Sequence, residues 1–384
     1  MRKLTNALLS LMIFFLISSN LTSTEPIKLT KNFTFFTEKN MQGYFKPLIT
    51  SVGESMNSNL FTRALYPDYW SIGLDISIMG MFIPDDQKYY DAELPLAYGN
   101  TSVVKNALLS EGAIIKDVGG TYKQPTVYGG PSTTIFAAPQ NKFTKTTSYN
   151  GELVPDSSYK SAYFAEGNDI SFMAGLPSIQ LIGAFPSRTE LRLRFLPLPV
   201  QNEMMIYWAV ILKQQFDHFF NLFDPDDHIG LAVHFAYHSM NRDPGLSLST
   251  FAVGVHASKA WDFGLTAYGG IQYEGLSGEF KAERERGKTS VLDFDVMNNP
   301  YPEVRKGGPI SFALESFNSF RLLGGLSYRT GIVELHADAA YASQPILNIG
   351  LTFWFAEWGK KEEKTESIER YEKIERYERI KKND

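Results

Sequence analysis

The stretch that decides the fold is Ile229-Gly-Leu-Ala-Val-His-Phe-Ala-Tyr237, in which large apolar residues alternate with small or polar ones. Successive side chains of a β-strand point to opposite faces of the sheet, so this alternation predicts a strand with one apolar and one polar face. The same pattern recurs along the chain and predicts about ten strands. They lie at residues 68–83, 178–185, 189–197, 203–213, 228–240, 247–258, 262–276, 317–329, 332–342 and 345–355.

A soluble, secreted β-sandwich also alternates, so three further features are needed to favour a membrane barrel. The predicted strands are long, mostly about 10–14 residues, as a tilted membrane strand requires and a typical soluble strand does not. Their polar faces repeat Arg, Glu, His and Asp, which suits a water-filled lumen. Aromatic residues gather near strand ends, as they do at the two membrane interfaces of a barrel. These are Tyr69, Trp70, Trp261, Tyr273, Tyr328, Trp354 and Trp358.

The sequence therefore predicts an all-β protein, an antiparallel transmembrane β-barrel of about ten strands with a short N-terminal helix. Tight connections at 186–188, 258–261 and 329–331 fall on one side of this barrel, and short turns are typical of the periplasmic side. The stretch 84–177 is too long for one ordinary loop and leaves room for one or two more hairpins. Twelve or fourteen strands therefore remain open.

The chain ends differ from the barrel in composition. Arg2 and Lys3 precede an apolar run at 7–17, which predicts a signal peptide over residues 1–24 because that run is too short to cross a membrane as a helix. Residues 25–67 are expected to form a helical plug or periplasmic segment, with Pro47 at the first helical position. The barrel is assigned to 68–358, a second short helix to 215–222, and a charged periplasmic tail to 359–384.

Composition excludes several functions. The 384 residues carry a net charge of -5, which gives no electrostatic reason to bind nucleic acid. The absence of Cys excludes disulfides, thiolate metal ligands and cysteine nucleophiles. No nucleophile elbow, phosphate-binding glycine loop or His-Glu-x-x-His motif occurs. We therefore expect neither an enzyme nor a cofactor.

The polar faces of the predicted strands supply the candidate site. Their charged residues suggest ion pairs that stiffen the barrel or narrow a pore, and their imidazoles suggest polar lining rather than a metal or catalytic site. Five histidines, at 228, 234, 238, 256 and 336, are placed in the lumen. The lumen-lining candidates are Arg192, Arg194, His234, His256, Arg321, Glu334, His336 and Asp338.

The last predicted strand, Asn348-Ile-Gly350-Leu-Thr-Phe353-Trp-Phe355, fits the signal by which outer-membrane barrels are assembled. Its pattern is a polar residue, then Gly350, then Phe353 and Phe355 on the apolar face. Such a strand usually ends the chain, whereas 29 residues follow Phe355 here. We expect the barrel-assembly machinery to recognise Asn348, Gly350, Phe353 and Phe355.

Several segments occur in an order that resembles a known family. They include Tyr44-Phe-Lys-Pro47-Leu48, Phe82-Ile-Pro84-Asp85, Pro125-Thr-Val-Tyr-Gly129 and, most strongly, Gly183-Ala-Phe-Pro186-Ser-Arg-Thr-Glu190-Leu-Arg-Leu-Arg194-Phe-Leu-Pro197. The family is an uncharacterised family of outer-membrane β-barrel proteins of Gram-negative bacteria, known only as a domain of unknown function. The chain departs from it at Gln214, where a His is frequent, and in the charged tail. Its layout is similar to that of outer-membrane channels for hydrophobic compounds, a likeness of architecture alone.

Two functions are favoured over a barrel enzyme, which would need a His paired with Asp or Ser at one lumen mouth. One is a channel for small or hydrophobic solutes, which predicts a continuous lumen with an apolar pocket and a movable helix at 47–60. The alternative is a structural or surface-interaction barrel that acts through its long extracellular loops, which predicts a blocked lumen. The expected location is the outer membrane of a Gram-negative bacterium, and the expected partners are its lipid, the barrel-assembly machinery and a small hydrophobic solute.

Overall fold

The computed structural model describes residues 27–28, 36–93, 121–131, 144–146, 153–155, 165–200, 203–242, 245–284 and 308–359. The signal peptide expected at 1–24 and the tail beyond residue 359 lie outside these ranges.

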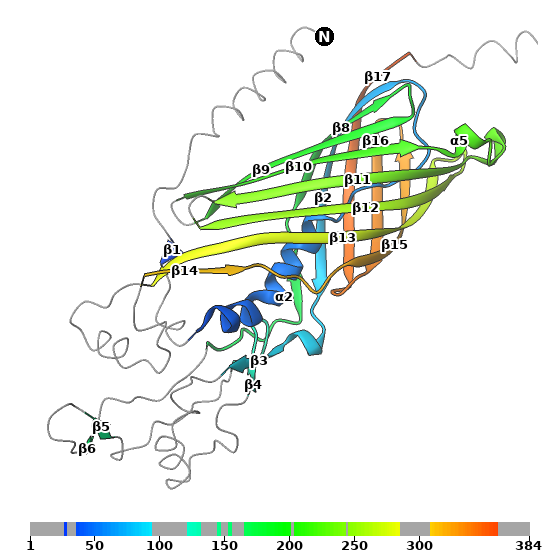
Figure 1. Ribbon diagram of the computed structural model, residues 1–384. Coiled ribbons are helices and arrows are strands. Elements are labelled where there is room, and N and C mark those ends of the chain that lie inside the picture. Colours follow the sequence, from blue (N-terminus) through cyan, green and yellow to red (C-terminus); the bar gives the residue numbers. More distant parts are fainter. Residues whose placement is uncertain are drawn as a thin grey trace, which may run out of the picture.

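Ten strands form one closed antiparallel barrel (Figure 1). Each of the ten strands pairs with the barrel strand before and after it in sequence, and β13 pairs directly with β15. The pairing of the first strand, β2, with the last, β17, closes the circle. The strands are β2 (Trp70–Phe82), β8 (Ser178–Phe185), β9 (Thr189–Val200), β10 (Glu203–Gln215), β11 (Ile229–Arg242), β12 (Leu246–Ala260), β13 (Leu265–Arg284), β15 (Phe320–Thr330), β16 (Val333–Tyr341) and β17 (Ile346–Trp358). The all-β barrel predicted from the alternation is confirmed, and every predicted strand has its counterpart.

The remaining strands lie at one end of the barrel or beyond it. β1 (Ile27–Lys28) and β14 (Gly308–Ala313) pair with β13, and β7 (Phe172–Ala174) pairs with β2. The long connection 84–177 does hold two hairpins among the described residues, as the sequence suggested. However, β3 (Tyr89–Glu93) pairs only with β4 (Thr121–Pro125), and β5 (Thr144–Thr146) with β6 (Leu153–Pro155), in separate two-stranded sheets. The circle therefore stays at ten strands.

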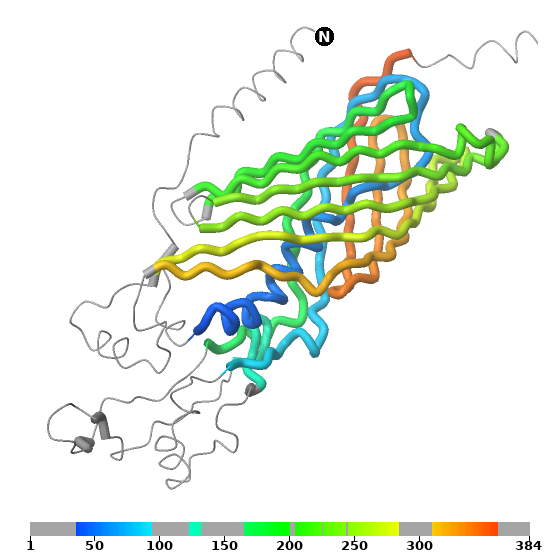
Figure 2. The backbone as a smooth tube through the Cα atoms, in the orientation of Figure 1, coloured from blue at the N-terminus to red at the C-terminus, as the bar shows by residue number. Residues whose placement is uncertain are grey.

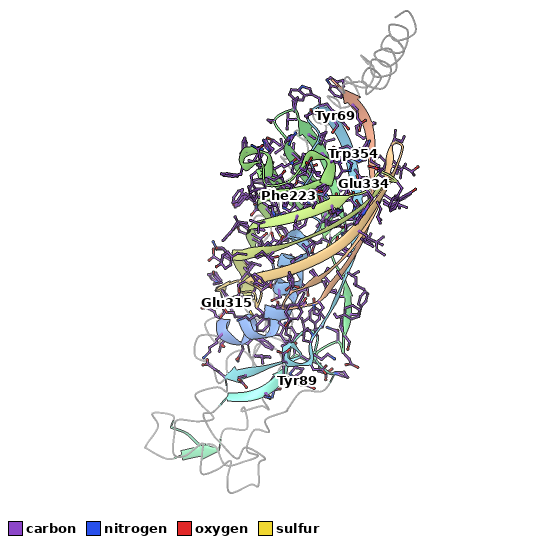
Figure 3. All side chains as sticks on the ribbon, turned by 90° about the vertical axis from the view of Figure 1, so that its right-hand side faces the viewer. Tyr69, Tyr89, Phe223, Glu315, Glu334 and Trp354 are labelled. Atoms are coloured by element: carbon purple, nitrogen blue, oxygen red, sulfur yellow. The ribbon has the colours of Figure 1, made fainter. Side chains whose placement is uncertain are left out.

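The alternation places apolar side chains outward. In β11, Val233, Phe235 and Tyr237 are exposed, whereas His234 and His238 are buried inside. Ile78 and Ile349 are more than 60% exposed. An apolar outer face on a closed ladder is what a membrane requires, because lipid cannot hydrogen-bond a free strand edge. The side-chain view shows this outer layer along the whole barrel (Figure 3).

The helix α2 (Glu38–Met56) enters the barrel at the end with the long connections, opposite the short helix α5 (Asp217–Phe220) and the end of β17 (Figures 1 and 2). The expected start at Pro47 is wrong. Thr37 caps the helix by accepting a hydrogen bond from the Asn40 N–H at 3.1 Å, and Pro47 lies inside it. An interior proline removes one helical hydrogen bond, and packing inside the barrel offsets that loss. None of the described helices is long and apolar enough to span a membrane.

The other short elements are two 3-10 turns, η3 (Asp85–Gln87) and η4 (Pro225–Asp227). Together with α5, η4 forms the connection between β10 and β11, which agrees with the short helix expected at 215–222. This connection and the turns 186–188, 261–264 and 331–332 all lie at the end of the barrel where β2 begins and β17 ends.

Candidate functional site: the plugged lumen

The lumen is filled by the chain's own N-terminal region. We call residues 38–66 the plug: it consists of α2 followed by the extended segment 57–66. Beyond α2 the plug contacts Glu274 of β13, then Asp75 of β2, then Gln215 at the end of β10, so it runs toward the short turns. It leaves the lumen there to begin β2. Consequently the polar wall residues face the plug and one another. The lumen is blocked rather than continuous, as the structural or surface-interaction alternative predicts, so a channel function requires the plug to move.

Part of the lumen around α2 is apolar, whereas Ser51 and Glu54 of the same helix hydrogen-bond to Gln344. Met41, Tyr44 and Met56 of the helix belong to one buried cluster with wall residues Tyr207 and Met240. Further apolar wall side chains border the same cluster: Leu196, Leu198, Met205, Leu246, Leu248, Leu276, Phe280 and Phe312. We call the space bounded by these wall residues the apolar chamber. In this structure α2 occupies the apolar chamber.

Two wall arginines bind the end of α2. Arg194 donates to the carbonyl oxygens of Met56, Ser58 and Asn59 at 2.8, 2.7 and 2.8 Å. Arg321 donates to the Glu54 carbonyl oxygen at 2.9 Å and to Ser58 Oγ at 2.6 Å. The C-terminal carbonyls of a helix lack helical partners and carry partial negative charge, so these two cations satisfy and neutralise them.

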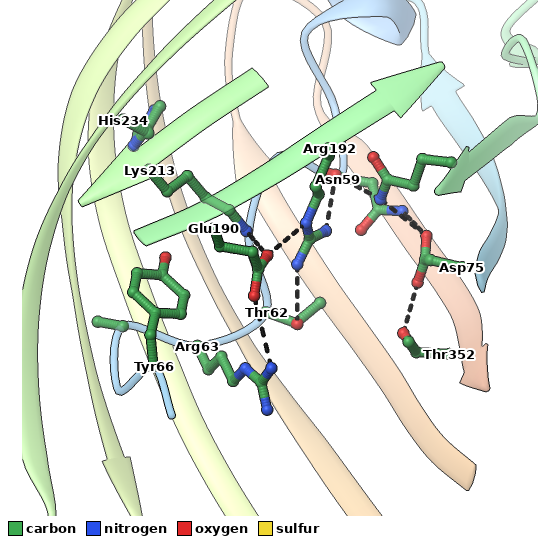
Figure 4. A network of polar contacts seen from close by, with 12 residues as sticks. Asn59, Thr62, Arg63, Tyr66, Asp75, Glu190, Arg192, Lys213, His234 and Thr352 are labelled. Atoms are coloured by element: carbon green, nitrogen blue, oxygen red, sulfur yellow. Dashed lines mark hydrogen bonds and ion pairs between the residues drawn. The ribbon is translucent and has the colours of Figure 1, made fainter. Parts of the chain in front are cut away.

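A second cluster surrounds one buried carboxylate. Glu190 pairs with Arg192 at 2.7 Å and with Lys213, its cross-strand neighbour on β10. Arg63 of the plug joins at 3.5 Å, and Arg192 also reaches Thr62 at 3.4 Å. Three cations thus share one carboxylate in a water-poor interior (Figure 4).

A third cluster centres on Asp75 of β2. The plug's Asn59 donates to Asp75 at 2.5 Å, His336 lies 2.7 Å from its other oxygen, and Thr352 donates to that same oxygen at 2.7 Å. Gln180 joins Asp75 at 2.9 Å and the Asn59 carbonyl at 3.2 Å. The carboxylate is fully hydrogen-bonded, as a buried charge must be.

The plug also inserts two aromatic rings among the wall histidines. Phe61 stacks on His256 with ring centroids 4.0 Å apart and lies 5.1 Å from His234. The Tyr66 hydroxyl lies 2.9 Å from His256 Nε2, and the two imidazoles contact each other at 3.0 Å. Among the described residues no group of three metal-ligating side chains occurs.

Glu54 is the one carboxylate that α2 carries into the lumen. Its Oε1 accepts hydrogen bonds from Ser343 Oγ at 2.6 Å and from the Gln344 N–H at 3.2 Å, while Oε2 has no partner. Burial raises the pKa of Glu54 to about 7, although nearby Arg321 opposes this shift. The docked plug therefore favours the protonated carboxyl.

The structure brings most of the predicted lumen candidates together. Arg192, Arg194, His256 and Arg321 contact the plug by hydrogen bonds, His234 packs against Phe61, and His336 reaches it through Asp75. Glu334 and Asp338 face inward elsewhere. Glu334 accepts from Trp354 Nε1, and Asp338 accepts from Tyr268 and Asn348.

One of the five histidines is misplaced. His228 lies in a turn with a side chain 48% exposed, 3.4 Å from Asp262, because the strand begins one residue later at Ile229. The sequence reasoning also missed functional positions in the plug and the wall. Lys213 could have been found as the cross-strand neighbour of Glu190, and Asp75 from its place on the polar face of β2. Phe61 and Tyr66 carry no sequence signal of this kind.

Several solved structures match the chain at low similarity. A structure named KdgM porin is 9% identical, with 47% of this chain and 93% of that chain covered and a TM-score of 0.24. OmpT of Vibrio cholerae, an outer membrane protein with loop L8 deleted, is 9% identical over 74% and 99%, TM-score 0.24. The translocator domain of the autotransporter NalP from Neisseria meningitidis is 11% identical over 80% and 94%, TM-score 0.22. Likenesses this weak transfer no function.

The comparison with curated proteins gave no match. A family model does match, and it covers residues 1–355, nearly the whole barrel and all of the plug. This confirms the resemblance drawn from the segments between Tyr44 and Pro197. The chain belongs to the Family of unknown function (DUF6588).

Proposed function

We propose that this protein is an outer-membrane channel for small hydrophobic solutes and that its own plug closes it. The observation that carries the proposal is the apolar chamber, which α2 fills in the closed state. A barrel wall with only a structural role does not need an apolar chamber beside its polar wall residues. A wall that passes apolar solutes does need one.

The barrel is built so that the plug can leave without opening it. Its hydrogen-bonded ladder closes through β2–β17 and β13–β15, and none of the described strands pairs with the plug. Wall charges are also paired within the wall: Glu190 with Arg192 and Lys213, and Glu274 with Arg321 at 2.7 Å. Withdrawal of the plug therefore exposes an intact wall rather than unpaired strands.

The outer-membrane location rests on the apolar outer face and the final strand. In β17, Phe353 and Phe355 point outward, whereas Asn348 is buried inside and Gly350 lies on the same inner face. This arrangement suits recognition by an assembly machinery at a lipid-facing strand. We propose that the short-turn end, where β2 begins and β17 ends, is periplasmic, so α2 plugs the barrel from the extracellular half.

A disulfide between the plug and the wall tests whether the plug closes the channel. A Cβ placed on Gly175 would lie 2.6 Å from Ser55 Oγ of α2 and 2.6 Å from Cγ of the flexible Met79 side chain, which must shift to make room. Cysteines at 55 and 175 would then be within bonding range, and the natural chain has no Cys. We would express Ser55→Cys/Gly175→Cys and measure entry of the apolar dye N-phenylnaphthylamine into cells. The expected result is wild-type entry under reduction and slower entry after oxidation, with the two single variants insensitive to oxidation.

Two outcomes would contradict the proposal, and they differ in meaning. If cells with the wild-type protein take up the dye no faster than cells without it, the barrel is not a channel for such solutes. The structural or surface-interaction barrel would then be the better interpretation. If uptake is faster but oxidation leaves it unchanged, the barrel conducts by a route that does not involve the plug.

A further inference from the structure

We propose that Arg194 and the apolar chamber form a binding site for a small amphipathic anion, with the acidic head on the guanidinium and the apolar chain in the chamber. This inference rests on the proposed channel function and narrows its solute class. In the closed state the end of α2 occupies both parts of the site.

Arg194 differs from the other lumen cations in what neutralises it. Arg63, Arg192, Lys213 and Arg321 each lie against a carboxylate. Arg194 is only 3% exposed, yet no carboxylate within the described part of the chain lies at ion-pair distance from it. Burying a cation without a counter-charge is unfavourable, so the carbonyl oxygens of the plug supply the negative partner.

The geometry of those contacts is that of an anion complex. Both terminal nitrogens of Arg194 point at plug oxygens, Nη1 at the Met56 carbonyl and Nη2 at the carbonyls of Ser58 and Asn59. A guanidinium presents the same fork to the two oxygens of a carboxylate or to a sulfonate, and bonds to a charged acceptor are stronger than bonds to a carbonyl. An anionic head would therefore replace the plug oxygens favourably.

Withdrawal of the plug makes the replacement necessary. Among the described residues Arg194 then keeps Gln180 Oε1 at 3.0 Å and the Tyr207 hydroxyl at 3.5 Å. Asp75 lies in the same row of the wall with Gln180 between it and Arg194, Arg321 and Glu274 pair with each other, and Glu54 leaves with the plug. Arg194 is then a lumen cation with no carboxylate at ion-pair distance within the described part of the chain.

The chamber lies directly beside this charge. On β9 the next inward-facing residues after Arg194 are Leu196 and Leu198, and Tyr207 and Met240 continue the apolar wall on the neighbouring strands. A solute with an apolar chain and an anionic head satisfies both features. A neutral chain leaves Arg194 unpaired, and a cationic head is repelled.

A buried reporter cysteine measures displacement of the plug. Leu60 is 1% exposed and belongs to an apolar cluster, so Leu60→Cys reacts with a water-soluble maleimide when the plug leaves. We would measure the rate of maleimide labelling of the protein in phospholipid vesicles, in the presence of either decanesulfonate or decyltrimethylammonium. These two surfactants have equal chain length and opposite charge. The sulfonate is expected to accelerate labelling by about tenfold more than the cation, as one charge-assisted pair predicts.

Matched charge removals assign the effect to one arginine. Arg194→Gln and Arg192→Gln each remove one lumen cation, but Arg192 already has Glu190 as its counter-charge. We expect Arg194→Gln to abolish the preference for the sulfonate and Arg192→Gln to keep it. Arg194→Lys, which retains the charge, should keep the preference and serves if the glutamine variant does not fold.

The outcomes separate this inference from the proposed function. Equal acceleration by both surfactants, or equal loss of preference in the two glutamine variants, would overturn the anion site and leave a plug that still moves. Absence of any labelling under every condition, together with dye uptake no faster than in cells without the protein, would overturn the channel itself and the anion site with it.

Discussion

Replacing Phe61 with alanine should release the plug, if the plug docks reversibly. Phe61 is 1% exposed and sits 4.0 Å from His256, 5.1 Å from His234 and 6.1 Å from Tyr268 by ring centroids. Truncating a buried Phe costs about 3–5 kcal/mol. That cost falls on the docked state, because a withdrawn plug no longer buries the ring. The undocked fraction should therefore rise by about a hundredfold or more.

The Leu60→Cys background supplies the assay. When the plug redocks faster than the maleimide reacts, the labelling rate is proportional to the undocked fraction. The matched control is Phe263→Ala in the same background, since Phe263 is 65% exposed in a turn outside the lumen. We expect Phe61→Ala to raise the rate by about two orders of magnitude and the control to leave it within about threefold.

An unchanged rate in Phe61→Ala, with the barrel still folded by its heat-dependent gel migration, would refute reversible docking. The plug would then be a fixed part of the core. A raised rate has a further check: the oxidised tether between positions 55 and 175 should restore slow labelling, because it holds α2 against the wall even when the ring is missing.

Three more outcomes follow. Because the pKa of Glu54 is about 7 when docked and near 4.5 when free, its contribution to docking is full below pH 4.5 and is lost as the pH rises through 7. The labelling rate of Leu60→Cys divided by that of the same variant carrying Glu54→Gln should therefore increase over that window. Taking the ratio removes the rise with pH that both variants share because the thiolate is the reacting form. Gly350→Ala should reduce the folded, heat-modifiable band, since its Cβ would lie 2.4 Å from the His336 ring, whereas Gly324→Ala, with nothing closer than 3.9 Å, should not. Glu190→Gln leaves the buried Arg192 and Lys213 and the partly exposed Arg63 without their carboxylate and should lower barrel stability in urea by about 3–5 kcal/mol, against little change for the exposed Glu315→Gln.

The strands could be predicted because lipid acts on every second residue. Val233, Phe235 and Tyr237 face the membrane and must be apolar, so the period of two is written directly into the sequence of β11. The N-terminal helix was harder. Its periodic residues indicated that a helix exists. The start was predicted at Pro47 rather than after the cap at Thr37, because a proline more often starts a helix than interrupts one.

The contacts of the plug left no comparable pattern. Arg194 was predicted to line the lumen, but its partners are backbone carbonyls of Met56, Ser58 and Asn59. Every residue has a backbone carbonyl, so a side chain that binds one does not restrict which residue type supplies it. Where the partner is a side chain, as in Glu190 with Lys213, the strand register alone would have been enough.

If the plug docks reversibly, the end of α2 explains how this contact can be both strong and reversible. Of the carbonyls in its last turn, Gly53 and Ser55 are satisfied by the N–H groups of Asn57 and Ser58, whereas Glu54 and Met56 accept from Arg321 and Arg194. The last carbonyls of any helix can be satisfied by water instead. Withdrawal of α2 therefore leaves its own carbonyls hydrogen-bonded to water. The unfavourable free energy of withdrawal then falls on Arg194, the lumen cation that has no carboxylate at ion-pair distance among the described residues. Whatever supplies an anion at that position shifts the balance between the closed and the open barrel.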